Sequence, residues 1–169
     1  MDKTGTKRIY LDNSLLIGWF LPYMRGITPK EEPDIIQFLL KHPEIEVFIS
    51  NFSIAELMES LLHGNIKGIR ECNKKQEFVM SLLNALRELV NFQIITHKGK
   101  NEIEGNFITK DVIPFTVCCK QPKDAIHVAI AQYENLCLVT HDTKSTVLSG
   151  LYKKTITDKH LYKFYEKHK

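Results

Sequence analysis

The stretch "IYLDNSLLIGWF" (residues 9–20) places one carboxylate, Asp12, between two apolar runs. Residues 8–12 are typical of a short buried strand that ends in a charge, and Asn13 and Ser14 begin an apolar helical run that extends to about Phe20. Burying an unpaired charge costs a large part of the stability of a small domain. Asp12 is therefore expected at the edge of the core, or beside a group that neutralises it.

The pattern of residues 9–20 repeats along the chain, because short apolar runs alternate with longer stretches of helical periodicity. The expected strands are residues 8–12, 46–50, 92–96, 136–140 and a short one near 152–156. The expected helices are residues 13–20, 34–39, 53–64, a helix within 66–91, 124–135 and 158–168. Pro22, Gly26, Pro29 and Pro33 mark a loop, and residues 97–122 show the weakest pattern.

Strands of about five residues that alternate with helices of ten or more indicate βαβ units and a parallel sheet. We therefore expect an α/β fold, with residues 1–169 forming one three-layer α/β/α domain around a central parallel sheet. The length of 169 residues suits one domain. Its last element is expected to be a basic helix at about residues 158–168.

Composition narrows the class of protein. The chain is 43% hydrophobic and 25% charged, as in ordinary globular proteins, and its apolar runs are too short to span a membrane. The N-terminal "MDKTGTKR" lacks the apolar segment of a signal peptide, so a cytoplasmic location is expected, with the four cysteines as reduced thiols. Residues 153–169 carry six lysines against two acidic residues, which suits either contact with an anionic polymer or a solvated helix face.

Four acidic residues are expected at one edge of the sheet. Asp12 ends the first strand, and Asp142 follows the strand at 136–140. Glu56 lies in the first turn of the helix after residues 46–50, and Asp124 opens another helix. Ligands of open parallel sheets bind beyond the carboxyl ends of the strands, which is where these residues fall.

Carboxylates gathered there would repel one another unless they were protonated or bridged by a cation. Their oxygen atoms suit Mg²⁺ or Mn²⁺, which bind through a few carboxylates and keep several waters. Such an ion activates water for attack on a phosphodiester. The acids therefore predict a nuclease site, with Lys123 and Lys144 as candidate contacts to RNA phosphates.

Three of the acids have a structural alternative. Ser53 and Glu56 form a capping-box pattern, in which Glu56 would bond the backbone of Ser53. Asp124 could serve as a helix N-terminal acid, and Asp142 could cap a turn. Asp12 has little to gain structurally from its place.

Two histidines adjoin these acids. A zinc site built from His127 and His141 with Cys118 or Cys119 is conceivable, but the spacing matches no common zinc pattern. We expect His127 to pack on the sheet.

The segments "IYLDNSLLI", "FISNFSIAELMESLL", "KDAIHVAIA" and "LCLVTHDTKS" resemble, in order and spacing, the four motifs of the PIN-domain family, whose best known members are VapC-like toxin ribonucleases. The resemblance implies a Mg²⁺-dependent endoribonuclease, often a homodimer and, where it is a toxin, paired with an antitoxin protein. It assigns catalysis to four acids, which are Asp12, Glu56, Asp124 and Asp142. All of them except Glu56 are expected to bind the metal. It assigns the family's small hydroxyl-bearing positions to Ser14 and Thr140.

The fourth segment departs from the family pattern, because Thr143, Lys144 and Ser145 stand where a second acid would follow Asp142. This departure puts a second metal site in question and supports the alternative of a catalytically inactive PIN-like module that binds RNA or a protein. A phosphotransfer domain is disfavoured because no acid adjoins Asp12. No glycine-rich phosphate loop is present.

Overall fold

The computed structural model describes residues 7–24, 35–62, 72–96, 122–141 and 150–166. Its strands are β1 (Arg8–Leu11), β2 (Glu46–Ser50), β3 (Phe92–Ile95), β4 (Cys137–Thr140) and β5 (Thr155–Thr157). Its helices are α1 (Asn13–Met24), α2 (Ile35–Leu40), α3 (Asn51–Leu62), α4 (Cys72–Arg87), α7 (Pro122–Tyr133) and α9 (Asp158–Glu166). The predictions for Asp142, Lys144, Cys118, Cys119 and residues 97–121 lie outside the described residues.

The five described strands form one sheet in the order β3-β2-β1-β4-β5, and every pairing is parallel. The predicted α/β class and central parallel sheet are confirmed. The chain proceeds outward from β1 to β3 and then returns to place β4 on the other side of β1. The strand order therefore reverses between β1 and β4, and this is the position where such sheets bind ligands.

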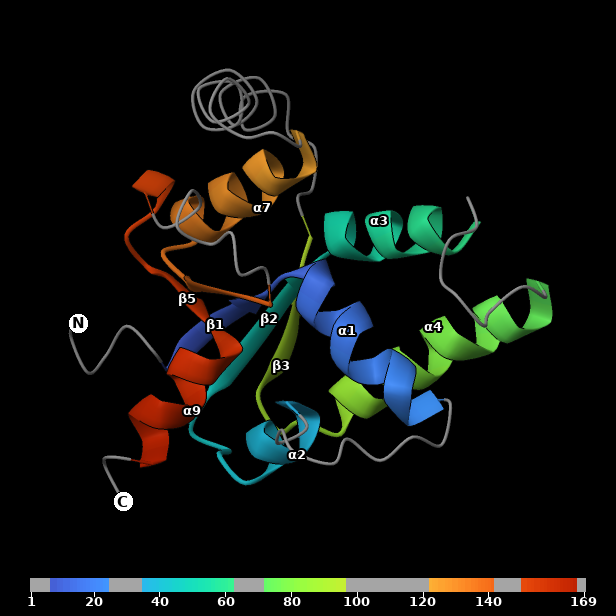
Figure 1. Cartoon of the computed structure of the whole chain (residues 1–169), viewed down its shortest axis with the longest axis horizontal. Helices are drawn as coiled ribbons and strands as arrows, with labels where there is room; N and C mark the ends of the chain where they lie inside the picture. Colours follow the sequence, from blue (N-terminus) through green and yellow to red (C-terminus); the bar gives the residue numbers. More distant parts are fainter. Residues whose placement is uncertain (1–6, 25–34, 63–71, 97–121, 142–149, 167–169) are drawn as a thin grey trace.

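Helices cover both faces of the sheet (Figure 1). Because side chains alternate along a strand, Ile9 and Leu11 lie on one face and Tyr10 on the other. Ile9 and Leu11 belong to a core that includes side chains of α1, α2, α3, α4 and α9. Tyr10 belongs to a second core, in which Phe48 and Leu138 pack with the alanines and branched residues of α7. Among the described helices, only α7 contributes fully buried residues to this second core.

Two helices differ from the sequence prediction at a proline. Helix α1 continues to Met24 instead of ending before Pro22. Pro22 lies in the last turn, so its missing N–H removes a single hydrogen bond near the helix end. Helix α7 begins at Pro122, two residues earlier than expected, since proline is favoured in the first turn of a helix.

The remaining helix and strand predictions differ only at their ends. The pattern within 66–91 is helix α4, whose buried Phe78, Leu82 and Leu86 pack in the first core while Val90, beyond the helix, is exposed. None of the helices in the described ranges has the length and apolar character needed to cross a membrane.

Candidate active site

Asp12 lies at the reversal point of the sheet, directly after β1. Its N–H donates to the carbonyl of Val139 on β4, at 3.0 Å. Its Oδ2 accepts hydrogen bonds from Ser14 Oγ at 2.6 Å and from Thr140 Oγ1 at 2.8 Å. The two hydroxyl positions predicted from the sequence therefore orient one oxygen of Asp12. The other oxygen, Oδ1, receives no hydrogen bond from the described residues and is 3.6 Å from Nε2 of His127.

Glu56 is on α3, and its side chain is available to the site because another residue caps that helix. The helix begins at Asn51, two residues earlier than predicted. Ser50 Oγ accepts the N–H of Ser53 at 3.1 Å, and Ser53 Oγ accepts the N–H of Ser50 at 3.3 Å. This reciprocal pair is a capping box with serine in place of the usual glutamate. The alternative that Glu56 caps the helix through Ser53 is therefore wrong.

One oxygen of Glu56 is held by two nitrogen donors. Asn13 Nδ2 donates to Oε2 at 2.6 Å, and His127 Nε2 contacts the same oxygen at 2.8 Å. Asn13 also donates to the carbonyl of Ser53, at 2.9 Å, so it joins the start of α1 to α3. Oδ1 of Asn13 is buried and has no hydrogen-bond partner among the described residues.

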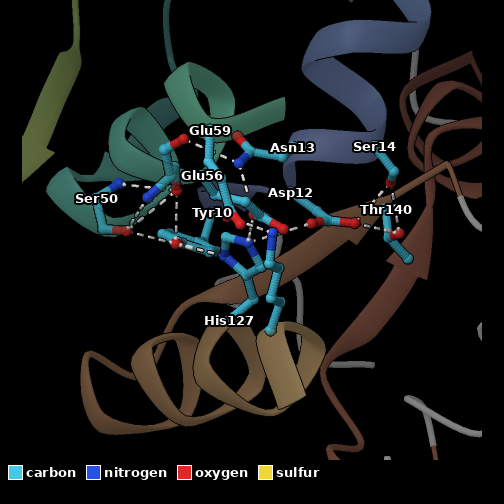
Figure 2. Close-up of polar contacts among 11 residues, drawn as sticks. Tyr10, Asp12, Asn13, Ser14, Ser50, Glu56, Glu59, His127 and Thr140 are labelled. Carbon is cyan, nitrogen blue, oxygen red and sulfur yellow. Dashed lines mark hydrogen bonds and ion pairs between the residues drawn. The ribbon is translucent and has the colours of Figure 1, made fainter. Parts of the chain in front are cut away.

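His127 connects the two carboxylates to the core. Its ring is buried between Tyr10 and Phe52, with centroid distances of 5.7 and 5.2 Å. Nδ1 is 2.8 Å from the hydroxyl of Tyr10, which in turn lies 2.8 Å from Oγ of both Ser50 and Ser53. Figure 2 shows His127 on α7 pointing toward Asp12 and Glu56.

The expectation that His127 only packs on the sheet is therefore incomplete. It does pack there, but its polar ring atoms also enter the candidate site. The sequence contains one signal for this position, since His127 follows Asp124 by three residues and so shares its helix face.

The proximity of His127 to the carboxylates shifts the ionisation of both partners. Burial favours neutral His127, but the hydrogen bond to Glu56 and the charges of Asp12 and Glu56 raise its pKa above the ordinary 6.5. Burial likewise opposes ionisation of Glu56, yet the hydrogen bond and charge of His127 hold its pKa below 4.5. The pair is thus an imidazolium beside a carboxylate at mildly acidic pH.

Burial also raises the pKa of Tyr10, so this hydroxyl stays protonated.

Asp124 and Lys123 lie in the first turn of α7. The charge of Asp124 contributes to the raised pKa of His127, which places it within electrostatic range of the site. Lys123 Nζ pairs with Glu59 Oε2 on α3, at 2.5 Å. Glu56 and Glu59 thus have separate partners, and the RNA-binding role predicted for Lys123 stays a prediction.

The zinc alternative gains no support from the two histidines. Nδ1 of His127 contacts Tyr10, and Nε2 contacts Glu56. His141 has its Nδ1 3.2 Å from Oδ2 of the buried Asp158, at the start of α9. The two histidines therefore have different carboxylate partners.

The described residues suit a divalent ion that keeps part of its water shell. Asp12 and Glu56 are each anchored through one oxygen, and neither Oδ1 of Asp12 nor Oε1 of Glu56 accepts a hydrogen bond from the part of the chain described. Within that part, no three His, Cys, Asp or Glu side chains form a complete metal-binding group. Mg²⁺ needs only one or two carboxylates from the protein, so the remaining oxygen of Asp12 meets part of that requirement.

The comparisons with known proteins bear on the family and the fold of the chain. The sequence pattern of the PIN domain matches residues 9–150. The chain belongs to the PIN-domain family. Comparison with curated proteins gives no match.

Two solved structures share the PIN fold with this chain. The crystal structure of PAE2754 from Pyrobaculum aerophilum is 17% identical, with a TM-score of 0.56, and the match covers 95% of this chain and 91% of that one. VapBC2 from Rickettsia felis, bound to a DNA fragment from its promoter, gives a chain 18% identical with a TM-score of 0.53. That match covers 89% of this PIN chain and 97% of the other.

Proposed function

We propose that this PIN-domain protein is a Mg²⁺- or Mn²⁺-dependent endoribonuclease that uses a metal-activated water. The observation that carries the proposal is that Asp12, directly after β1, and Glu56, on α3, both lie beside His127 at the reversal point of the sheet. The proposed catalytic residues are Asp12, Glu56, Asp124 and Asp142, with all but Glu56 as metal ligands. When bound, the ion would supply a nucleophilic water and stabilise the leaving oxygen.

The protein's own residues prepare this site by orienting its carboxylates. Ser14 and Thr140 fix the Asp12 carboxylate through Oδ2 and leave Oδ1 directed away from them. Asn13 and His127 do the same for Glu56 through Oε2. Hydrogen bonds of this kind fix the orientation of a ligand, and their loss commonly lowers metal affinity or activity by roughly 10- to 100-fold.

The test is cleavage of a mixed population of RNAs by the purified protein, with and without Mg²⁺ or Mn²⁺. We expect cleavage only with the metal, and we expect Asp12→Asn to reduce the rate by more than about 100-fold, since it alters a direct ligand. His42→Gln is the control, because it replaces a buried polar residue that contacts a glutamate outside the site. We expect it to leave the cleavage rate unchanged. Metal-independent RNA binding without cleavage would instead identify an inactive binding module.

We further propose a cytoplasmic toxin that forms homodimers and is inhibited by a small antitoxin encoded beside it. The PIN family and a fold shared with the VapBC2 chain support this role. Expression of the protein should arrest growth, and Asp12→Asn should abolish the arrest. Co-expression of the product of the neighbouring gene should restore growth. Growth arrest that persists with Asp12→Asn would count against a nuclease toxin.

A further inference from the structure

We propose that the imidazole of His127 occupies the place that a second divalent ion would take, so that this site binds a single ion. The proposal rests on the metal-dependent function proposed above and specifies how many ions act there. It also assigns His127 as the positioning residue of Glu56.

The position of Nε2 between the two carboxylates carries the inference. It is 2.8 Å from Oε2 of Glu56 and 3.6 Å from Oδ1 of Asp12. An ion shared by these carboxylates would need oxygen atoms at roughly 2.0–2.2 Å. The ring edge and its hydrogen therefore occupy the space between the carboxylates that such an ion requires. Figure 2 shows His127 pointing toward Asp12 and Glu56.

The ring of His127 is held in this place from its opposite side. Its side chain is 3% exposed, and Nδ1 contacts the Tyr10 hydroxyl, which Ser50 and Ser53 both contact. Moving the ring away from Glu56 would break the contact between its buried Nδ1 and the Tyr10 hydroxyl, which is costly in a low-dielectric core. His127 is therefore a fixed part of the site.

A hydrogen-bond donor faces the carboxylates whether His127 is neutral or charged. In the cation both nitrogens donate, and the Tyr10 hydroxyl then donates to a serine. In the neutral form with hydrogen on Nε2, Tyr10 donates to Nδ1. Only the other neutral tautomer would direct a lone pair at the Glu56 carboxylate, and repulsion disfavours it. The proposal therefore depends on position and not on a particular charge state.

One ion still has ligands in the remaining volume. Oδ1 of Asp12 is not used by Ser14 or Thr140, and Asp124, one turn before His127 on α7, is the second ligand that we propose. Glu56 also keeps one oxygen, Oε1, because Asn13 and His127 both contact Oε2, but the ring of His127 lies between Glu56 and Asp12. We therefore assign Glu56 to water or substrate beside the ion, and not to a direct bond with a second ion.

The experiment measures Mn²⁺ binding to the full chain by equilibrium titration and by electron paramagnetic resonance, without RNA. In wild type we expect one ion per chain and the spectrum of an isolated Mn²⁺. Two ions at the spacing of about 3.5–4 Å known for two-metal sites would give a spin-coupled spectrum. That spectrum in wild type would overturn the proposal.

His127→Ala tests whether the ring is what excludes the second ion, with His42→Ala as the matched loss of a buried histidine that contacts a glutamate. We expect the bound ions to rise from one to two in His127→Ala and to stay at one in His42→Ala. One ion in both variants would overturn the role given to His127. If His127→Ala fails to fold, a crystal of wild type soaked in Mn²⁺ decides, because an ion bonded to both Asp12 and Glu56 would contradict the proposal.

These results are separable from those on function. RNA cleavage by a protein that binds two ions would overturn this inference and leave the ribonuclease proposal standing. A single bound ion without metal-dependent cleavage would support the single-ion inference and overturn the ribonuclease proposal.

Discussion

Asp12 shows how one charged residue is accommodated at the end of a buried strand. Two hydroxyl groups, from Ser14 and Thr140, bond one of its oxygens, and the ring nitrogen of His127 lies near the other. Hydrogen bonds to an ionised acceptor are among the stronger ones in proteins. The polar groups that a carboxylate needs are thus supplied by the protein, and one oxygen remains for a ligand.

Removing a single hydroxyl tests this arrangement. Thr140→Val removes the donor to Asp12 Oδ2 and keeps the side-chain shape, so we expect Mn²⁺ affinity to fall by about 10- to 100-fold. The measurement is a Mn²⁺ titration of wild type and variant.

Thr155→Val on β5 is the matched control for Thr140→Val. The hydroxyl of Thr155 is buried without a hydrogen-bond partner among the described residues. Its loss should leave Mn²⁺ affinity unchanged and leave stability equal or higher. Equal Mn²⁺ affinity in all three proteins would show that Thr140 does not orient Asp12.

At the scale of single residues, the sequence predicted the acids better than their partners. The sequence singles out Asp12 because a charge at the end of an apolar strand gains little structurally. It does not single out His127, because the role of this residue depends on Tyr10, which is distant in sequence and lies on a different element. Nothing in the local pattern shows that a strand tyrosine and a helix histidine meet.

At the scale of elements, the start of α3 decides what Glu56 can do. The pattern Ser53-x-x-Glu56 permits a capping box, but the strand β2 ends at Ser50 and the helix begins directly after it. Ser50 and Ser53 then cap each other. Sequence periodicity predicts the apolar face of a helix but not its first residue. Because α3 begins two residues earlier than predicted, Ser50 and not Ser53 is the N-cap, and Glu56 does not take part in the cap.

The Ser50 cap makes a prediction about stability. Ser50→Ala removes the N-cap of α3 and one contact of the Tyr10 hydroxyl, so we expect a loss of about 1 kcal/mol in unfolding free energy. Asn13 donates both to the carbonyl of Ser53 in this turn and to Glu56, so RNA cleavage should fall as well. Urea unfolding and cleavage assays measure the two effects.

Thr157→Ala is the control for Ser50→Ala, because Thr157 accepts the N–H of His160 at the start of α9. It should lower stability without lowering cleavage. If Ser50→Ala changed neither quantity, the cap would have no part in holding α3.

At the scale of the whole molecule, the strand order brings the site together. Asp12 and Thr140 are 128 positions apart in the chain, and they meet because β4 returns to pair with β1. Alternating strands and helices predicted the parallel sheet, and the general rule for such sheets predicts the edge at which Asp12 and Glu56 lie. The partners across that edge depend on side-chain packing between α3 and α7, which periodicity does not encode.

The pairing of His127 with Glu56 joins α7 to α3 and should make folding stability depend on pH. The raised pKa of His127 contributes stability that is complete below 6.5 and is lost as the pH rises through the raised value. The lowered pKa of Glu56 contributes stability that is complete above 4.5 and is lost as the pH falls through the lowered value. The pair therefore stabilises the fold most between these two ordinary values.

The stability difference between wild type and His127→Gln, from urea unfolding without metal, should be largest in that window and should shrink toward both acidic and alkaline pH. His42→Gln should show a weaker dependence, because the partner of His42, Glu44, is 44% exposed and solvent screens the pair. A His127→Gln difference that stayed constant across the window would mean that packing alone, and not charge pairing with Glu56, accounts for the contribution of this histidine.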